Sequence, residues 1–244
     1  MVDLEALTPM MSIIGWIIVA IQSIWFFLEP IGWHISFKGV VRNWVKWDSK
    51  DIAITAMGAA GLAALMWVGD LFPMVPGLPS YTWGWTVFWG FYPAMVLLFG
   101  VPGAFATVIT HLLHDTWTGA LHAWTWDGLT RDVFFMIFWY YWIKHPRKMF
   151  TASGMAKHII GSVVSFELAA LGLSAVADTF KLIPYWVAFL AVNNPVAIAG
   201  WLFGGFIILG AIITRIMTPL AERYGFLARD RHVPRGKDAD KDKG

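Results

Sequence analysis

Residues 111–128, HLLHDTWTGALHAWTWDG, gather three histidines, two aspartates and three tryptophans within a strongly apolar chain. His111, His114 and Asp115 are spaced i, i+3 and i+4, which places them on one face if this segment is helical. Imidazole and carboxylate groups at this spacing can hydrogen-bond a small polar molecule, or they can bind zinc, copper, nickel or iron. The stretch is therefore the first candidate for a binding site.

The tryptophans around these polar groups favour an organic ligand over a metal ion. Indole rings offer stacking and cation–π faces, and a few neighbouring polar groups give orientation, which together suit a small heteroaromatic or cationic molecule. The same stretch, the neighbouring loops and a later apolar run supply the expected substrate-binding residues: Trp83, Trp85, His111, His114, Asp115, Trp117, Trp124, Trp126, Glu167 and Asn193.

A metal site is the alternative. Glu167 lies near the middle of an apolar run, where an ionisable group is costly to bury and is a functional candidate for that reason. With His111, His114 and Asp115 it could complete a metal shell, or it could instead hold two helices together as a neutral, hydrogen-bonded group. No second histidine-rich segment supports the metal reading, so we expect no metal and no other cofactor.

The composition indicates that this site belongs to a membrane protein. Hydrophobic residues make up 58% of the 244 residues and charged residues only 14%, whereas about 25% charged residues is usual in soluble domains. The chain is therefore expected to be an integral membrane protein. It contains no cysteine, which excludes thiol catalysis, disulfides and thiolate metal sites.

Seven apolar runs are candidates for membrane spans. Each must be helical, because an open sheet would leave backbone groups unpaired in lipid. The turn FGVPG makes the third and fourth runs a hairpin. The runs are residues 11–33, 51–69, 83–99, 103–118, 129–143, 157–177 and 195–217.

The basic residues predict the orientation in the membrane. Of the 18 lysines and arginines, all but Arg131 and Lys181 fall in the first loop, the fifth loop or the C-terminal segment. The positive-inside rule then places the N-terminus outside and the C-terminus in the cytoplasm. The 111–128 stretch is expected on the extracytoplasmic face, together with the loops 69–85 and 178–195.

Three regions follow from this topology. We expect a first helix with its basic cytoplasmic loop (1–50), a six-helix membrane domain (51–217) and a charged, disordered cytoplasmic tail (218–244). The whole is predicted to be all-α and multi-pass, and to lie in the cell membrane.

The second apolar run carries small residues at helical spacing. Ala56, Ala60 and Ala64 recur at i, i+4 and i+8, a spacing that lets another helix approach closely. The approaching helix could belong to this chain or to a partner.

These features together resemble the S-component of energy-coupling factor (ECF) transporters, the membrane subunit that binds a vitamin or a metal. The resemblance spans about residues 48–217 and rests on the alanine-rich helix, on YPAMVLLFGVPGAFATVITHLLHD and on FLAVNNPVAIAGWLFGG. It implies a six-helix bundle, here with the extra helix at 11–33. It also implies a ligand site at the outer loops and a docking face at Ala56, Ala60 and Ala64 for a coupling subunit driven by cytoplasmic ATPases. Metal-binding relatives begin Met-His, whereas residue 2 here is Val2.

The expected function is therefore that of a non-enzymatic, substrate-binding subunit that takes up a small vitamin-like molecule from outside. Transition-metal transport, or a membrane metalloenzyme subunit, is the alternative. The chain has no phosphate-binding Gly-x-x-x-x-Gly-Lys motif, so energy must come from a partner or from ion coupling. A retinal protein is excluded because residues 195–217 contain no lysine, and nucleic-acid binding has no folded basic surface to support it.

Overall fold

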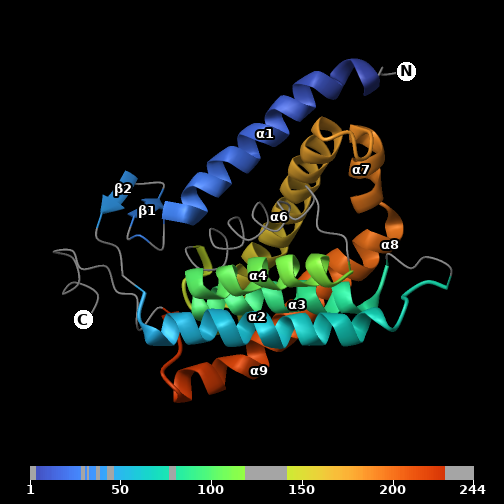
Figure 1. Ribbon diagram of the computed structural model, residues 1–244. Coiled ribbons are helices and arrows are strands. Elements are labelled where there is room, and N and C mark those ends of the chain that lie inside the picture. The colour runs from blue at the N-terminus through green and yellow to red at the C-terminus, as the bar shows by residue number, and fades with distance from the viewer. Residues whose placement is uncertain are drawn as a thin grey trace.

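The computed structural model describes residues 4–28, 31, 33–36, 39–42, 47–76, 81–118 and 142–228, and nearly all of its regular structure is helical (Figure 1). Four helical segments within these ranges are long and apolar enough to cross a membrane. They are Leu4–Ile24, Ser49–Asp70, Ala152–Thr179 and Tyr185–Arg223. The chain is thus a helical, multi-pass membrane protein, as its composition predicts.

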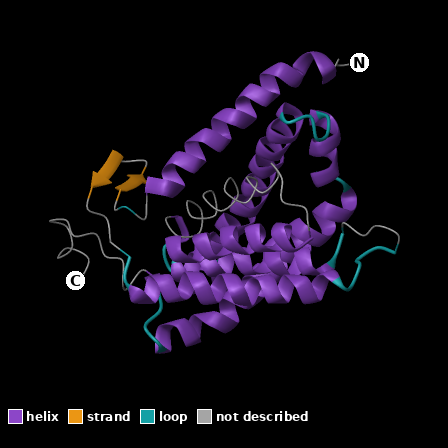
Figure 2. Ribbon diagram, in the orientation of Figure 1, coloured by secondary structure: helices purple, strands orange, loops and turns teal. Residues whose placement is uncertain are grey.

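The N-terminal region contains a helix and a short hairpin. Helix α1 (Leu4–Leu28) overlaps the predicted run 11–33, but it begins before residue 11 and ends before residue 33. Strands β1 (Trp33–Ser36) and β2 (Gly39–Arg42) follow it as an antiparallel pair, drawn as arrows in Figure 2. The described regular structure is otherwise helical, so the predicted all-α fold class is confirmed, and this short strand pair lies in the segment predicted as the first loop.

Helices α2 (Ser49–Asp70), α3 (Trp83–Phe99) and α4 (Val101–Thr118) lie side by side (Figure 1). Asp48 begins α2 with a capping box, in which its side chain accepts hydrogen bonds from backbone amides. Gly100, with φ 63°, ends α3 and reverses the chain into α4. The predicted hairpin is therefore confirmed, and α2 packs on α4 with Thr110 Oγ1 donating to the Ala59 carbonyl at 3.2 Å.

The C-terminal half contains a longer set of helices. It begins with the short 3₁₀ helix η3 (Pro146–Phe150) and the long α6 (Ala152–Thr179). Next come α7 (Tyr185–Val192), α8 (Pro195–Ala197), the π-helical segment η4 (Ile198–Leu209) and α9 (Gly210–Arg223). Residues 129–141 of the predicted run 129–143 lie outside the described residues.

Two boundaries in this half differ from the sequence prediction. The predicted loop 178–195 contains α7, which starts after Pro184 and buries Tyr185 and Ala188. The last helix continues beyond residue 217 to Arg223, because Thr218 and Ala221 lie on a face buried against α3. The predicted tail therefore begins with helix, and residues 229–244 lie outside the described part.

The largest core cluster is aromatic. It joins α3 to η4 and α6 through buried rings, and the ring centroids of Trp89 and Phe206 are 4.8 Å apart. Gly205 brings the backbone of η4 against α3, since a Cβ atom at this position would lie 2.7 Å from the Cβ of Trp89. Rigid packing of these elements fixes the wall on which the candidate site is built.

Candidate functional site

The candidate site is centred on a histidine–aspartate pair that joins α4 to α2. His114 Nε2 donates to Asp70 Oδ2 at 2.6 Å, and the hydroxyl of Thr82 donates to the other oxygen of the same carboxylate. The His114 side chain is 8% exposed and that of Asp70 19%. The pair therefore ties together the end of α2, the residue before α3 and the last turn of α4, away from most of the solvent.

The local sequence explains why Asp70 reaches this position. Asp70 is the last residue of α2, and Thr82 is the residue on which α3 begins. Gly69 and Gly84 let the two helix ends approach closely, because a Cβ atom on either glycine would collide with the backbone of the other helix. The α2–α3 connection is also pinned by a hydrogen bond from the Trp83 amide to the Phe72 carbonyl, at 3.0 Å.

A second carboxylate lies on the opposite side of the His114 ring. Asp115 Oδ1 is 3.4 Å from His114 Nδ1, and Asp115 Oδ2 is 3.5 Å from His111 Nε2. Both nitrogens of His114 thus face carboxylate oxygens, and only a protonated imidazolium can donate from both. The arrangement suits a cationic His114 between two anions, with the shorter bond to Asp70 as the stronger one.

Aromatic rings form one wall beside this pair. The indole ring of Trp85 meets both histidines edge to face, with centroid distances of 5.2 Å to His111 and 5.1 Å to His114. Behind it, Trp201 of η4 stacks on Tyr81 with centroids 5.2 Å apart. Such a wall offers π faces and little competing water.

The end of this wall carries polar groups that can meet a ligand. Asn194 Nδ2 donates to the Tyr81 hydroxyl at 2.6 Å. The indole nitrogen of Trp201 is buried and has no hydrogen-bond partner among the described residues. A buried donor without a partner is costly, and a ligand carbonyl or ring nitrogen would satisfy it.

The structure brings together only some of the predicted site residues. His111, His114, Asp115 and Trp85 meet in one cluster, as the sequence predicts. Trp117 is 71% exposed and packs on Trp67 outside the cluster.

The remaining predicted residues either share no hydrogen bond, ion pair or ring contact with this cluster within the described residues, or lie outside those residues. Trp83 is 50% exposed. Glu167 of α6 is near Asn193, which follows α7. Trp124 and Trp126 lie outside the described residues.

The sequence prediction missed the central carboxylate. Asp70 directly follows the second predicted run, and its position at the predicted extracytoplasmic end of that run was the available signal. Thr82, Tyr81, Asn194 and Trp201 were also missed, because each lies in a loop or an aromatic run without a recognisable motif.

The metal alternative requires a group of ligands that the described residues do not supply. Within those residues, no group of three or more histidine, aspartate, glutamate or cysteine side chains is arranged to hold a metal ion. His114 is instead engaged by two carboxylates through hydrogen bonds.

The predicted docking residues face outward. Ala56, Ala60 and Ala64 are exposed on α2, whereas Thr55, Ala59 and Met66 of the same helix are buried. Within the described part of the chain, packing on α3 and α4 therefore uses a different face of α2 from the alanine face.

Comparisons with protein-family models, with curated protein sequences and with solved structures give no match for this chain. Its function must therefore be argued from the cluster of His114, Asp70, Asp115 and Trp85.

Proposed function

We propose that this chain is the substrate-binding membrane subunit of a transporter, and that it takes up a small heteroaromatic or cationic molecule from the extracytoplasmic side. The observation that carries the proposal is the part-buried pair of His114 and Asp70 beside the aromatic residues Trp85 and Trp201. Charged groups are costly to hold within an apolar helical bundle, and for that reason they are candidates for a functional site. Resemblance to ECF S-components in the sequence is consistent with this role.

The site supplies two kinds of contact to such a molecule. The rings of Trp85, Trp201 and Tyr81 offer stacking or cation–π attraction of about 0.5–2 kcal/mol each. The Trp201 indole nitrogen, which has no partner within the described part of the chain, offers a hydrogen-bond donor, and the carboxylates of Asp70 and Asp115 offer acceptors. A planar ligand with a polar edge would use both kinds of contact.

The proposed topology has seven spans, with the N-terminus outside and the C-terminus in the cytoplasm. The antiparallel course of α2, α3 and α4 supports it, because the end of α2, the start of α3 and the end of α4 meet at the His114 cluster. The basic loop and tail residues lie toward the opposite ends of these helices in the sequence. The proposed location is the cell membrane.

The proposed partner is a transmembrane coupling subunit driven by cytoplasmic ATPases. The exposed face of Ala56, Ala60 and Ala64 supports this part of the proposal, because small side chains permit close approach of a second helix.

The test is mass spectrometry of the small molecules that the purified chain retains. We expect one organic molecule at near-equal stoichiometry in the wild type, and its loss from Trp85→Ala. Trp117→Ala is the matched control, since this tryptophan lies outside the cluster, and it should retain the molecule. Retention by both variants would place the ligand elsewhere, and a stoichiometric transition metal in place of an organic molecule would contradict the proposed ligand class.

A further inference from the structure

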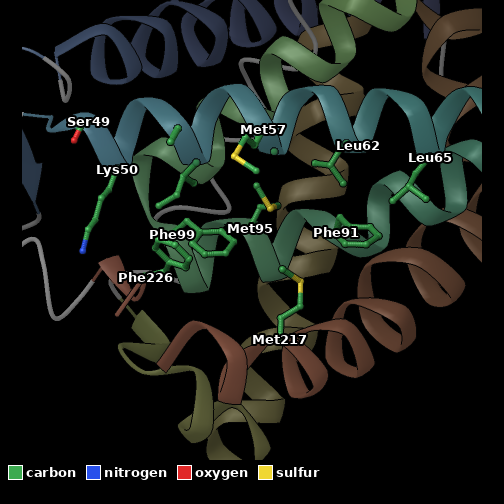
Figure 3. A pocket seen from close by; sticks show the side chains of 14 residues that line it. Ser49, Lys50, Met57, Leu62, Leu65, Phe91, Met95, Phe99, Met217 and Phe226 are labelled. Carbon is green, nitrogen blue, oxygen red and sulfur yellow. The ribbon is translucent and has the colours of Figure 1, made fainter. Parts of the chain in front are cut away.

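A second, separate feature is an apolar groove on the side of the bundle. It has a volume of about 580 Å³ and lies between α2, α3 and the C-terminal segment that includes α9 (Figure 3). This volume falls within the range of small-molecule sites. The lining is almost wholly apolar, and its polar members are Ser49 and Lys50.

The groove lies beside the alanine face of α2. Successive residues of a helix are about 100° apart, so the groove residues Met57 and Gly61 lie more than about 100° from the centre of the buried face. They lie only about 60–100° from Ala60. The groove therefore adjoins the proposed docking face, and its inner side is formed by Leu62 and Met95 of a buried core cluster.

One end of the groove carries a lysine. Lys50 lies at this end beside Ser49, and Phe226 approaches from the opposite wall (Figure 3). Asp48 and Asp51, which flank Lys50 in the sequence, accept hydrogen bonds from backbone amides in the capping box of α2 and do not line the groove. Within the described part of the chain, the ammonium group of Lys50 forms no ion pair with them.

The apolar part of the groove is about as long as the tail of an amphiphile. From Ala53 to Leu65 the helix advances about 18 Å at 1.5 Å per residue. The hydrocarbon of one leaflet is about 15 Å thick, half of the usual 30 Å. Methionine side chains line the middle of the groove, and their flexibility suits a chain of variable shape.

We propose that this groove is a binding site for an anionic phospholipid, with one acyl chain along Met57, Gly61 and Leu65 and the phosphate at Lys50 and Ser49. An apolar channel with a single cation at one end has the charge pattern of such a lipid. A partner helix would match this pattern only if it also placed a carboxylate at Lys50, whereas an anionic phospholipid carries its phosphate next to its acyl chains. The site is independent of the proposed ligand site at His114.

The experiment uses the full chain purified in detergent and incubated with equal amounts of dioleoyl-phosphatidylglycerol and dioleoyl-phosphatidylcholine. Native mass spectrometry then counts the lipid retained. We expect one retained lipid, with about a fivefold preference for phosphatidylglycerol, the effect of one lysine at a membrane surface. Lys50→Gln should retain lipid without this preference, while Lys148→Gln, a lysine outside the groove, should keep it.

A second variant tests the acyl-chain channel. A Cβ atom on Gly61 would meet nothing within 4 Å, so Gly61→Phe should fold normally and fill the groove. It should retain neither lipid, whereas Ala60→Phe, one residue away on the exposed face, should behave as the wild type. Equal retention of both lipids by the wild type, retention of neither, or undiminished retention by Gly61→Phe would each overturn the proposal.

Discussion

Replacing Asp70 with alanine should destabilise the outer end of the bundle in a measurable way. The substitution removes the acceptor of the 2.6 Å bond from His114 and of the bond from Thr82. A hydrogen bond to a charged group contributes about 1.5–3 kcal/mol. Because the Asp70 side chain is 19% exposed and Asp115 remains beside His114, we expect a loss of about 2 kcal/mol, toward the lower part of that range.

The assay is thermal unfolding of the purified chain in detergent, followed by tryptophan fluorescence. For a chain of 150–250 residues, 1 kcal/mol shifts the melting temperature by about 2–4 °C, so Asp70→Ala should lower it by roughly 4–8 °C. Asp178→Ala is the matched control, because Asp178 also lies at the end of a helix and its side chain makes no bond to the site. It should change the melting temperature little.

A double-mutant cycle distinguishes the interaction between Asp70 and His114 from a general loss of stability. If Asp70 and His114 stabilise each other, the loss caused by Asp70→Ala together with His114→Ala should be smaller than the sum of the two single losses. Additive losses, or equal melting temperatures for Asp70→Ala and Asp178→Ala, would refute the view that this pair organises the site.

Three further predictions concern topology, docking and the core. Because the chain lacks cysteine, a single cysteine at Leu71 should react with a membrane-impermeant maleimide added to intact cells, and one at Lys148 should not; the reverse pattern would contradict the proposed orientation. Ala60→Leu should abolish uptake by cells while leaving ligand bound to the isolated chain, since it blocks helix approach without touching the outer site; loss of both would indicate internal packing. Gly205→Ala should lower the unfolding free energy by about 1–3 kcal/mol, because its added methyl would lie 2.7 Å from the Trp89 Cβ; an unchanged melting temperature would contradict the close packing of η4 on α3.

The bounds of the helices that lie between clear turn sequences could be predicted closely from the sequence. The predicted run 83–99 has the same bounds as α3, and the run 51–69 differs from α2 by one or two residues at each end. Proline, glycine and aspartate residues flank both helices and mark their ends. A long apolar run between such residues leaves few alternatives in a membrane.

The first helix was harder to place because its start depends on a distant contact. Its first turns contain Glu5, Thr8 and Pro9, which read as a polar leader rather than as helix. In the structure, Trp186 of α7 donates to the Leu4 carbonyl at 2.7 Å and contacts the Thr8 hydroxyl at 3.0 Å. A contact across 182 residues leaves no local pattern.

The candidate site was predicted only in part, because some of its contacts also join residues far apart in the sequence. His111, His114 and Asp115 share one helix, so their spacing alone places them together. Asp70 joins them from a position 44 residues earlier than His114, through an approach of α2 and α3 that depends on Gly69 and Gly84. Helical periodicity does not report such an approach between two different helices.

The central claim is that the His114 cluster binds a small molecule, and adding the ligand back tests it most directly. The molecule extracted from wild-type protein is returned at about 100 times its dissociation constant to ligand-free wild type and to His114→Gln, and the melting temperature of each is measured. Binding at that concentration stabilises the folded state by about 2.7 kcal/mol, so the wild type should melt about 5–10 °C higher and His114→Gln should not respond. An equal rise in both proteins would contradict the claim.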